Sequence, residues 1–273
     1  FLMIRRPPRS TPLYSSAASY VYKRQDLDDM AAKLSDRTKL VILNSPQNPA
    51  GCIMTKKELD IVAGLLEERD DVYVLSDEIY KDIIYDGQHS SIASYPHMLD
   101  QTIILDGFSK SFAMTGWRLG WAVLPTTDEA AIFKQLNINT ISCVPPFLQE
   151  GGRAAYEDPS TIKTVSEMVT AFERRRDWVV PALNSITGVT CQLPKGSFYV
   201  FPNVAGVCDR LGIFEAYEAL SSTAKRKTTP GGMLQMFLLY RYGVATMDRA
   251  SFGRIGSEAV SYTHLTLPTN REV

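Results

Sequence analysis

One lysine, Lys110, lies among small and hydroxyl-bearing residues in the stretch GFSKSFAMTGWRLGWA, residues 107–122. Ser109 directly precedes it, and Arg118 follows eight positions later. A lysine amine can bind an aldehyde covalently. A guanidinium with a nearby hydroxyl suits a phosphate, whose oxygens match the planar fork of arginine. The stretch therefore indicates a site for a phosphorylated aldehyde.

A carboxylate, Asp77, ends the apolar run DVYVLSD at residues 71–77. Burying a carboxylate there is costly unless a cationic group pairs with it. A protonated pyridine nitrogen would be such a partner, and the protonated ring is what draws electrons from a carbanion. Together with the amine of Lys110 and the phosphate-binding groups, Asp77 predicts pyridoxal 5′-phosphate as the cofactor.

Three apolar runs predict the strands that position these groups, at residues 39–46, 71–77 and 101–108. Continuous Val, Ile and Leu without alternation is typical of a parallel sheet buried on both faces. Between the first two runs, Thr55 and Glu58 are spaced as a capping box. A crossover helix is therefore expected there, and its apolar face comprises Leu59, Val62, Ala63 and Leu66.

Polar residues follow the ends of all three predicted strands. Asn48 follows the first, Asp77 ends the second with Tyr80 close behind, and Ser109 and Lys110 follow the third. Ligands of such sheets bind outside the carboxyl ends of the strands. We therefore expect these side chains to converge on one site.

The second half of the chain predicts a smaller α/β unit. A long helix is expected from Ser160, with apolar residues at helical spacing and a kink near Pro181. Residues 188–204 predict strands around a glycine turn, 214–220 a short helix, and 232–247 a helix that runs into a strand.

The two ends differ from the middle. Residues 1–25 are basic, rich in Pro and Ser, and without a regular apolar period, and they resemble translated sequencing-adapter sequence, as does the tail at 259–273. Both are expected to be non-native, and 1–25 to be disordered. A nucleic-acid arm or a targeting peptide is the alternative for 1–25. Between these ends we expect a partial cofactor-binding domain at 26–157, and a small C-terminal domain with the interdomain helix at 158–258.

Composition narrows the function classes. Lys plus Arg is 29 and Asp plus Glu is 30 of 273 residues, so the net charge favours neither nucleic acid nor an anionic membrane as partner. No apolar run of about 18 residues is present to span a bilayer. Four scattered cysteines without CxxC favour a reducing, cytoplasmic compartment, and three histidines without metal-ligand spacing predict no metal site.

Three motifs carry a family resemblance: NSPQNPAG at 44–51, SDEIY at 76–80 and SKSFAMTGWRLG at 109–120. They resemble the ordered signature blocks of the class I and II aminotransferases, which are fold type I pyridoxal-phosphate enzymes. The resemblance extends from about residue 26 to about residue 258. It implies an α/β fold, with an incomplete large domain built on a mostly parallel sheet and a smaller C-terminal α/β domain.

The resemblance also implies roles for the site residues. Lys110 matches the lysine that forms the internal aldimine and serves as the catalytic base, and Asp77 matches the partner of the ring nitrogen. Tyr80 and Asn48 match donors to the phenolic oxygen of the ring. The phosphate ligands match Ser109 and Arg118.

The reaction so implied is transamination between an amino acid and a 2-oxo acid in amino-acid metabolism, with ping-pong kinetics and a homodimeric full-length parent. Two positions depart from the family pattern, with Ala50 for a common Thr and Gly107 for a common Ser. The family's substrate-carboxylate arginine has no match, although Arg249 and Arg254 lie near its place. We therefore expect an incomplete fragment. The alternatives are a lyase or synthase with the same fold and cofactor, and a non-catalytic fragment.

Overall fold

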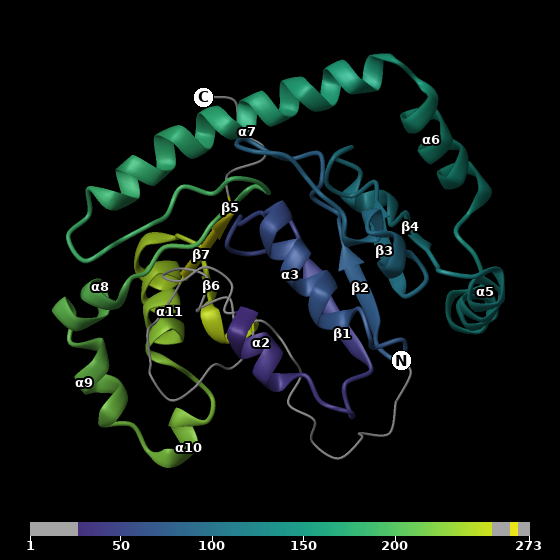
Figure 1. Ribbon diagram of the computed structural model, residues 1–273. Helices are drawn as coiled ribbons and strands as arrows, with labels where there is room; N and C mark the ends of the chain where they lie inside the picture. Colours follow the sequence, from purple (N-terminus) through teal and green to yellow (C-terminus); the bar gives the residue numbers. More distant parts are fainter. Residues whose placement is uncertain (1–26, 253–262, 267–273) are drawn as a thin grey trace. The chain divides into compact units, whose positions relative to one another are not determined.

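The structure is a computed structural model that describes residues 27–252 and 263–266 (Figure 1). The described chain forms two compact units. The first comprises 27–46 and 53–168, and the second comprises 47–52, 169–252 and 263–266. The sequence placed the domain boundary after residue 157, whereas the units divide inside a long helix, after Met168. The expectations for residues 1–25 fall outside the described residues.

The first unit contains a four-stranded sheet in the order β1-β2-β3-β4. The first three strands are parallel, as predicted, and β4 runs antiparallel to β3. The register places Asn44 opposite Asp77, and Asp77 opposite Leu105, so the carboxyl ends of the three parallel strands share one edge. The strands are β1 (Leu40–Asn44), β2 (Tyr73–Asp77), β3 (Thr102–Gly107) and β4 (Gly120–Val123).

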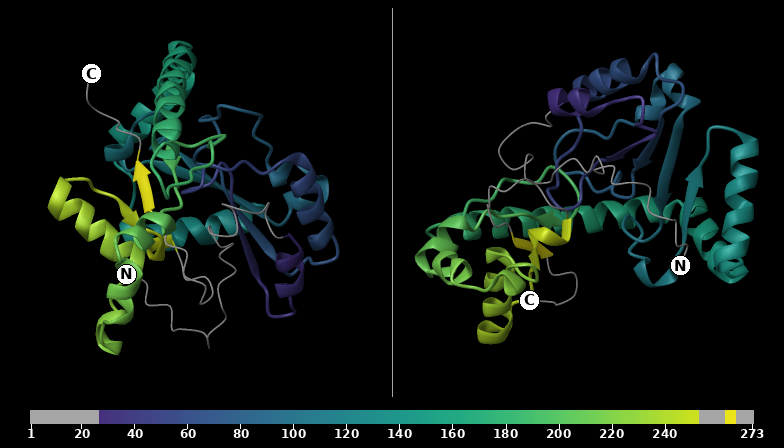
Figure 2. Two further views of the ribbon diagram at one scale, coloured as in Figure 1. Left: turned by 90° about the vertical axis from the view of Figure 1, so that its left-hand side faces the viewer. Right: turned by 90° about the horizontal axis from the view of Figure 1, so that it is seen from below.

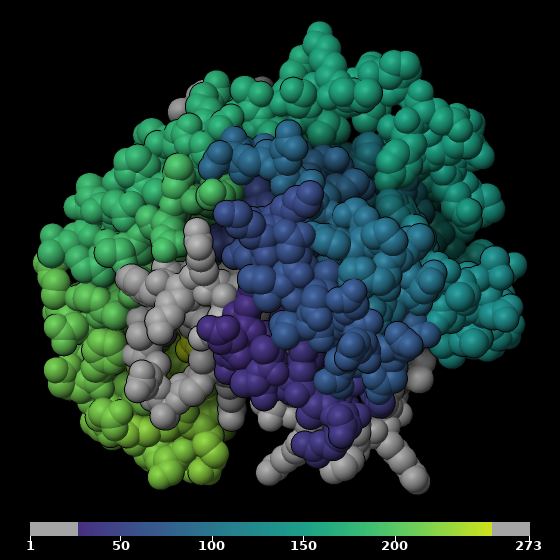
Figure 3. Space-filling view, in the orientation of Figure 1, coloured from purple at the N-terminus to yellow at the C-terminus, as the bar shows by residue number. Residues whose placement is uncertain are grey.

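The predicted crossover helix is α3 (Lys56–Leu66). Its capping box is formed, because the Thr55 side chain accepts from the backbone N–H of Glu58 and the Glu58 carboxylate accepts from that of Thr55. The four apolar residues expected on its inner face are all buried. The short helix α2 (Leu27–Lys33) joins the same apolar core through Leu27, and it lies beside α3 in the space-filling view (Figure 3).

The expectation that the strands are buried on both faces is wrong for β1. Val41 and Leu43 are buried, whereas Leu40 and Ile42 are 43% and 44% exposed. Side chains alternate between the two faces of a strand, so among the described residues the packing over β1 covers one face only. A continuous apolar run therefore does not by itself show that both faces are covered.

Short elements, two helices and the start of a third complete the first unit. The connection from β2 to β3 contains η1 (Ile92–Ser94) and α4 (Pro96–Leu99), and η2 (Thr115–Trp117) precedes β4. After β4 come α5 (Thr127–Ile141) and α6 (Pro146–Glu157). Helix α7 (Ser160–Asn184) follows and is shared between the units, and it continues without a break through Pro181. It is the long green helix in Figure 2.

The second unit has its own small core and a three-stranded antiparallel sheet in the order β5-β7-β6. The strands expected in 188–204 are shorter than predicted, with one two-residue strand and an isolated bridge between Thr190 and Asn203. Strand β7 lies within 259–273, the segment expected to be non-native. The elements are β5 (Tyr199–Val200), α8 (Ala205–Arg210), α9 (Ile213–Glu218), α10 (Ser222–Lys225), α11 (Pro230–Tyr242), β6 (Met247–Asp248), η3 (Arg249–Phe252) and β7 (Thr263–Thr266).

Candidate cofactor site

Asp77 is the last residue of β2, and its backbone is fixed by the neighbouring strand. Its carbonyl oxygen accepts hydrogen bonds from the side-chain amide of Asn44 at 3.1 Å and from the backbone N–H of Ser45 at 3.3 Å. Its carboxylate accepts from the backbone N–H of Ile79 at 3.3 Å. The position of the Asp77 backbone therefore follows from the pairing of β1 and β2.

Lys110 lies in the loop after β3, close to the turn that follows β2. Its Nζ is 5.6 Å from the centroid of the Tyr80 ring. Tyr80 is buried, and the turn that carries it is closed by hydrogen bonds from Lys81 N to Glu78 O and from Ile83 N to Tyr80 O. Two residues from adjacent strand ends are thus brought together, as the sequence predicts.

Charges couple Lys110 to its neighbours. Burial lowers the pKa of the Lys110 amine, the nearby Arg118 guanidinium lowers it further, and the Asp77 carboxylate opposes both effects. Burial likewise raises the pKa of Asp77, against the Ile79 N–H and the Lys110 charge, which lower it. A lysine with a lowered pKa has more of the neutral amine that attacks carbonyl groups.

Aromatic packing holds the Lys110 loop against α6. The rings of Phe108, Phe112 and Tyr156 form a cluster with centroid separations of 4.9 to 5.2 Å. The hydroxyl of Tyr156 accepts a hydrogen bond from the indole N–H of Trp121 on β4 at 3.0 Å. Phe112 therefore serves packing beside the site, and the cluster fixes the chain on both sides of Lys110.

The two residues expected to bind the phosphate, Ser109 and Arg118, differ in their exposure to solvent. Arg118 is exposed, adopts a left-handed backbone conformation with φ 54°, and donates from Nη1 to the carbonyl oxygen of Thr115 at 3.0 Å. Ser109 is half-buried and directly precedes Lys110. Phosphate binding by either residue stays a prediction.

Asn48 lies on the loop 47–52, which the structure groups with the second unit. Its side chain is exposed. The loop is closed by a hydrogen bond from Gly51 N to Gln47 O at 3.0 Å, and the carbonyl oxygen of Gly51 accepts from the backbone N–H groups of Lys195 and Gly196 at 2.9 and 3.0 Å. That Asn48 joins Asp77 and Lys110 at one site stays a prediction.

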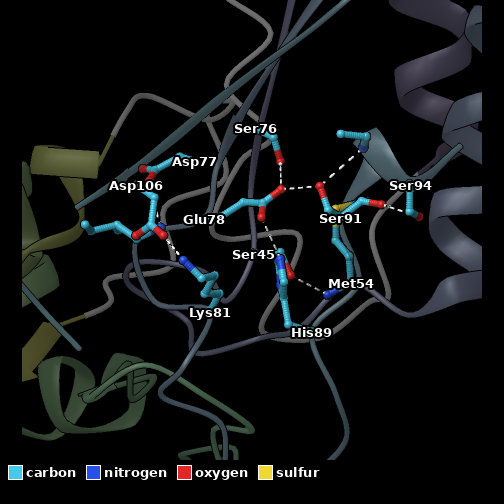
Figure 4. Close-up of polar contacts among 12 residues, drawn as sticks. Ser45, Met54, Ser76, Asp77, Glu78, Lys81, His89, Ser91, Ser94 and Asp106 are labelled. Atoms are coloured by element: carbon cyan, nitrogen blue, oxygen red, sulfur yellow. Dashed lines mark hydrogen bonds and ion pairs between the residues drawn. The ribbon is translucent and has the colours of Figure 1, made fainter. Parts of the chain in front are cut away.

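The sequence reasoning missed a buried carboxylate next to Asp77. Glu78 accepts hydrogen bonds from the hydroxyls of Ser76 at 2.9 Å and Ser91 at 2.5 Å, and its Oε2 lies 2.9 Å from Nε2 of His89 (Figure 4). The sequence does contain a pattern that could have identified Glu78. Two adjacent acidic residues at a strand end must point to opposite faces, so the second needs partners of its own. Two of its three partners, His89 and Ser91, lie in the connection 81–100, which has no clear apolar period.

A second buried carboxylate, Asp106, ion-pairs with Lys81 (Figure 4). The Lys81 amine also lies 5.3 Å from the centroid of the Trp121 ring. This pair ties the turn after β2 to β3 and β4. Among the described residues, no group of three or more His, Cys, Asp or Glu side chains could hold a metal ion, and no helix is long and apolar enough to span a membrane.

Comparison with known proteins identifies the family. Residues 5–266 match the family described as aminotransferase class I and II, and the chain belongs to this family. A probable aspartate/prephenate aminotransferase of Aquifex aeolicus is 34% identical over 238 residues, which cover 86% of this chain and 56% of the relative. An aspartate aminotransferase of Musicola paradisiaca is 38% identical over 179 residues, or 65% of this chain and 44% of the relative.

Solved structures agree with this assignment. The crystal structure of an aromatic aminotransferase from Pyrococcus horikoshii superposes with a TM-score of 0.74 at 32% identity, over 89% of this chain and 59% of that chain. The chain thus spans about half the length of the relatives it matches. The fold is therefore that of the fold type I aminotransferases, as the sequence predicts.

Enzymes of this family use pyridoxal 5′-phosphate, and the described residues fit that group. Lys110 offers an amine with a lowered pKa, and Asp77 offers a carboxylate at the adjacent strand end that interacts with it. Arg118 supplies a cation in the same loop. These three groups match the cofactor, because the amine suits its aldehyde, the carboxylate its ring nitrogen and the guanidinium its phosphate.

Proposed function

We propose that this chain binds pyridoxal 5′-phosphate through Lys110 and catalyses transamination between an amino acid and a 2-oxo acid. The observation that carries the proposal is the position of the Lys110 amine, 5.6 Å from the centroid of the Tyr80 ring and near enough to Asp77 for the two charges to influence each other. Family membership supports it, because the relatives are named as aspartate, aspartate/prephenate and aromatic-amino-acid aminotransferases.

Lys110 and Asp77 carry the chemistry in this proposal. The Nζ of Lys110 would hold the aldehyde of the cofactor. When a substrate amine frees it, the Lys110 amine would take the proton from the α-carbon and deliver it to the cofactor carbon that carried the aldehyde. The lowered pKa of Lys110 suits this, because a general base works best when its pKa lies near the working pH. Asp77 holds the proton on the ring nitrogen, so the bound cofactor supplies a ring that stores the electrons of the α-carbanion.

The remaining residues orient the cofactor. Tyr80 and Asn48 would donate hydrogen bonds to its phenolic oxygen. Arg118 and Ser109 would bind its phosphate, Arg118 through the guanidinium fork. The substrates we propose are small amino acids and 2-oxo acids of the aspartate or aromatic group.

We propose further that the protein works as a homodimer in the cytoplasm. No disulfide joins any of its four cysteines, all of which lie in the described part of the chain, and this supports a reducing compartment. Relatives of this family set the expectation of a dimer, which sedimentation analysis of the purified protein would test.

The test is cofactor binding by the 273-residue chain. Pyridoxal 5′-phosphate is added while its absorbance is followed, and the mixture is then reduced with borohydride and the labelled peptide mapped by mass spectrometry. We expect one label, on Lys110, which is lost in Lys110→Ala and kept in the control Lys134→Ala, a change of an exposed lysine on α5. Labels spread over many lysines would overturn the proposal.

Exchange of amino groups tests the reaction itself. The loaded chain is mixed with ¹⁵N-aspartate and 2-oxoglutarate, and ¹⁵N in glutamate is measured. Cofactor bound at Lys110 without any exchange, across aspartate and the aromatic amino acids, would contradict transamination. Release of sulfide or of a cyclised product from other amino acids would then favour a lyase or a synthase.

A further inference from the structure

Glu78 is a carboxylate that the proposed chemistry does not use, although it lies directly beside Asp77. It is buried, and a buried carboxylate is costly unless hydrogen bonds satisfy it. Three side chains do so, namely Ser76, His89 and Ser91. Together they hold the pKa of Glu78 below its ordinary value, against the effect of burial. Glu78 is therefore ionised near neutral pH.

The partners of Glu78 come from separate parts of the chain. Ser76 belongs to β2, whereas His89 and Ser91 lie 11 and 13 residues beyond Glu78 in the connection to β3. Ser91 also caps η1, because its hydroxyl accepts from the backbone N–H of Ala93 at 3.2 Å. The Glu78 carboxylate thus ties the end of β2 to the start of η1.

The backbone around Asp77 is held on both sides. On one side, the carbonyl oxygen of Asp77 accepts from Asn44 and Ser45 of the β1 segment. On the other side, the N–H of Glu78 donates to the carbonyl oxygen of Leu105 on β3 at 2.9 Å. Asp77 is the last residue of β2, and the backbone N–H of Glu78 continues the pairing with β3 by one more hydrogen bond.

Adjacent residues of an extended chain point to opposite faces. Figure 4 shows this, because the carboxylates of Asp77 and Glu78 point to opposite sides of the backbone. Fixing Glu78 on the face of His89 and Ser91 therefore leaves Asp77 on the face where it interacts with Lys110.

We propose that Glu78 is a positioning residue, whose hydrogen bonds to Ser76, His89 and Ser91 keep the Asp77 carboxylate directed at the cofactor's ring nitrogen. This inference rests on the proposed function, because it assigns Glu78 a task at the same site. Glu78 itself touches neither the cofactor nor the substrate in this proposal.

The direction in which Glu78→Gln changes cofactor binding distinguishes a positioning role of Glu78 from a purely electrostatic one. The negative charge of Glu78 contributes to raising the pKa of Asp77. If charge were all that mattered, Glu78→Gln would lower the pKa of Asp77 and leave cofactor binding unchanged or tighter. Positioning requires the opposite result, since the side-chain amide introduced by Glu78→Gln cannot accept all three hydrogen bonds and the 77–80 turn loosens.

The experiment is a double-mutant cycle read by equilibrium binding of pyridoxal 5′-phosphate to the 273-residue chain. Glu78→Gln is made alone and in the Asp77→Asn background, and the dissociation constant is measured from the cofactor's absorbance. We expect weakening of about fivefold or more when Asp77 is present, and of less than about twofold when it is replaced, because contacting residues that act as a unit are not additive.

Two further variants keep the test decisive. Ser91→Ala removes one donor to Glu78, and we expect weakening in the same direction that also depends on Asp77, so this variant serves if Glu78→Gln does not fold. The matched control is Asp60→Asn, which removes an exposed carboxylate on α3 that accepts from the hydroxyl of Tyr95 and has no contact with Glu78 among the described hydrogen bonds, and it should leave the dissociation constant unchanged.

The outcomes distinguish the two proposals. Equal weakening by Glu78→Gln in both backgrounds, or unchanged or tighter binding when Asp77 is present, would overturn the positioning role alone. If Asp77→Asn and Lys110→Ala themselves leave cofactor binding unchanged, the proposed function fails as well.

Discussion

Gly51 and Pro194 lie so close that a side chain at residue 51 has no room. A Cβ atom on Gly51 would lie 2.4 Å from the Cβ of Pro194 and 2.8 Å from the carbonyl oxygen of Gly196. Gly51 also has φ +67°, in the left-handed region that side chains disfavour. The loop that carries Asn48 is thus held against residues 194–196 by direct backbone contact.

Gly51→Ala is therefore expected to destabilise the second unit. The left-handed conformation and the contact with Pro194 together should lower the free energy of unfolding by roughly 1 to 3 kcal/mol. The control is Gly64→Ala, because Gly64 lies inside helix α3 with nothing within 4 Å of an added Cβ, and it should gain about 0.5 to 1 kcal/mol. Urea unfolding followed by circular dichroism measures both, and equal effects of the two changes would refute the account of Gly51.

The lowered pKa of Lys110 predicts how its acylation depends on pH. Only the neutral amine reacts, so Lys110 should be labelled by acetic anhydride at lower pH than the average lysine peptide, as read by mass spectrometry. Arg118→Gln removes a charge that lowers the pKa of Lys110, so the labelling midpoint should move up. Asp77→Asn removes a charge that raises this pKa, so the midpoint should move down. Shifts in the same direction would contradict the proposed coupling.

Helix α3 provides a stability test of the first unit. Leu66 is fully buried in its core, and Leu66→Ala should cost about 2 to 5 kcal/mol of unfolding free energy through lost packing and a cavity. Ile61 on the same helix is 49% exposed, and Ile61→Ala should change stability by about 0.5 kcal/mol or less. Equal losses of unfolding free energy in the two variants, measured by chemical denaturation, would contradict this account of the core.

Two cysteines should differ strongly in reactivity. Burial raises the pKa of the Cys191 thiol to about 11, whereas Cys143 is exposed. Because the thiolate is the nucleophile, Ellman's reagent at pH 8 should modify Cys143 quickly and Cys191 only after unfolding in urea. Cys143→Ser should remove the fast phase, and rapid labelling of Cys191 in the native chain would contradict its burial.

Local patterns in the sequence sufficed for the parallel strands and for helix α3. The capping box of Thr55 and Glu58 and the buried face of α3 depend on residues three or four positions apart, so they could be read without knowing the rest of the fold. The strand end at Asp77 followed from where its apolar run stops, and with it the closeness of Tyr80 and Lys110. Strand β1 ends at Asn44, two residues earlier than the predicted run at 39–46.

Only the tertiary structure decided which surfaces meet. The exposure of Leu40 and Ile42 depends on what packs on each face of β1. Two of the three partners of Glu78 lie 11 and 13 residues away, in a connection without a clear period. The grouping of the Asn48 loop with residues 194–196 spans still more of the chain. A sequence pattern records the local preference of each segment for strand or helix, but contacts between distant segments depend on the path of the whole chain, which only the folded structure reveals.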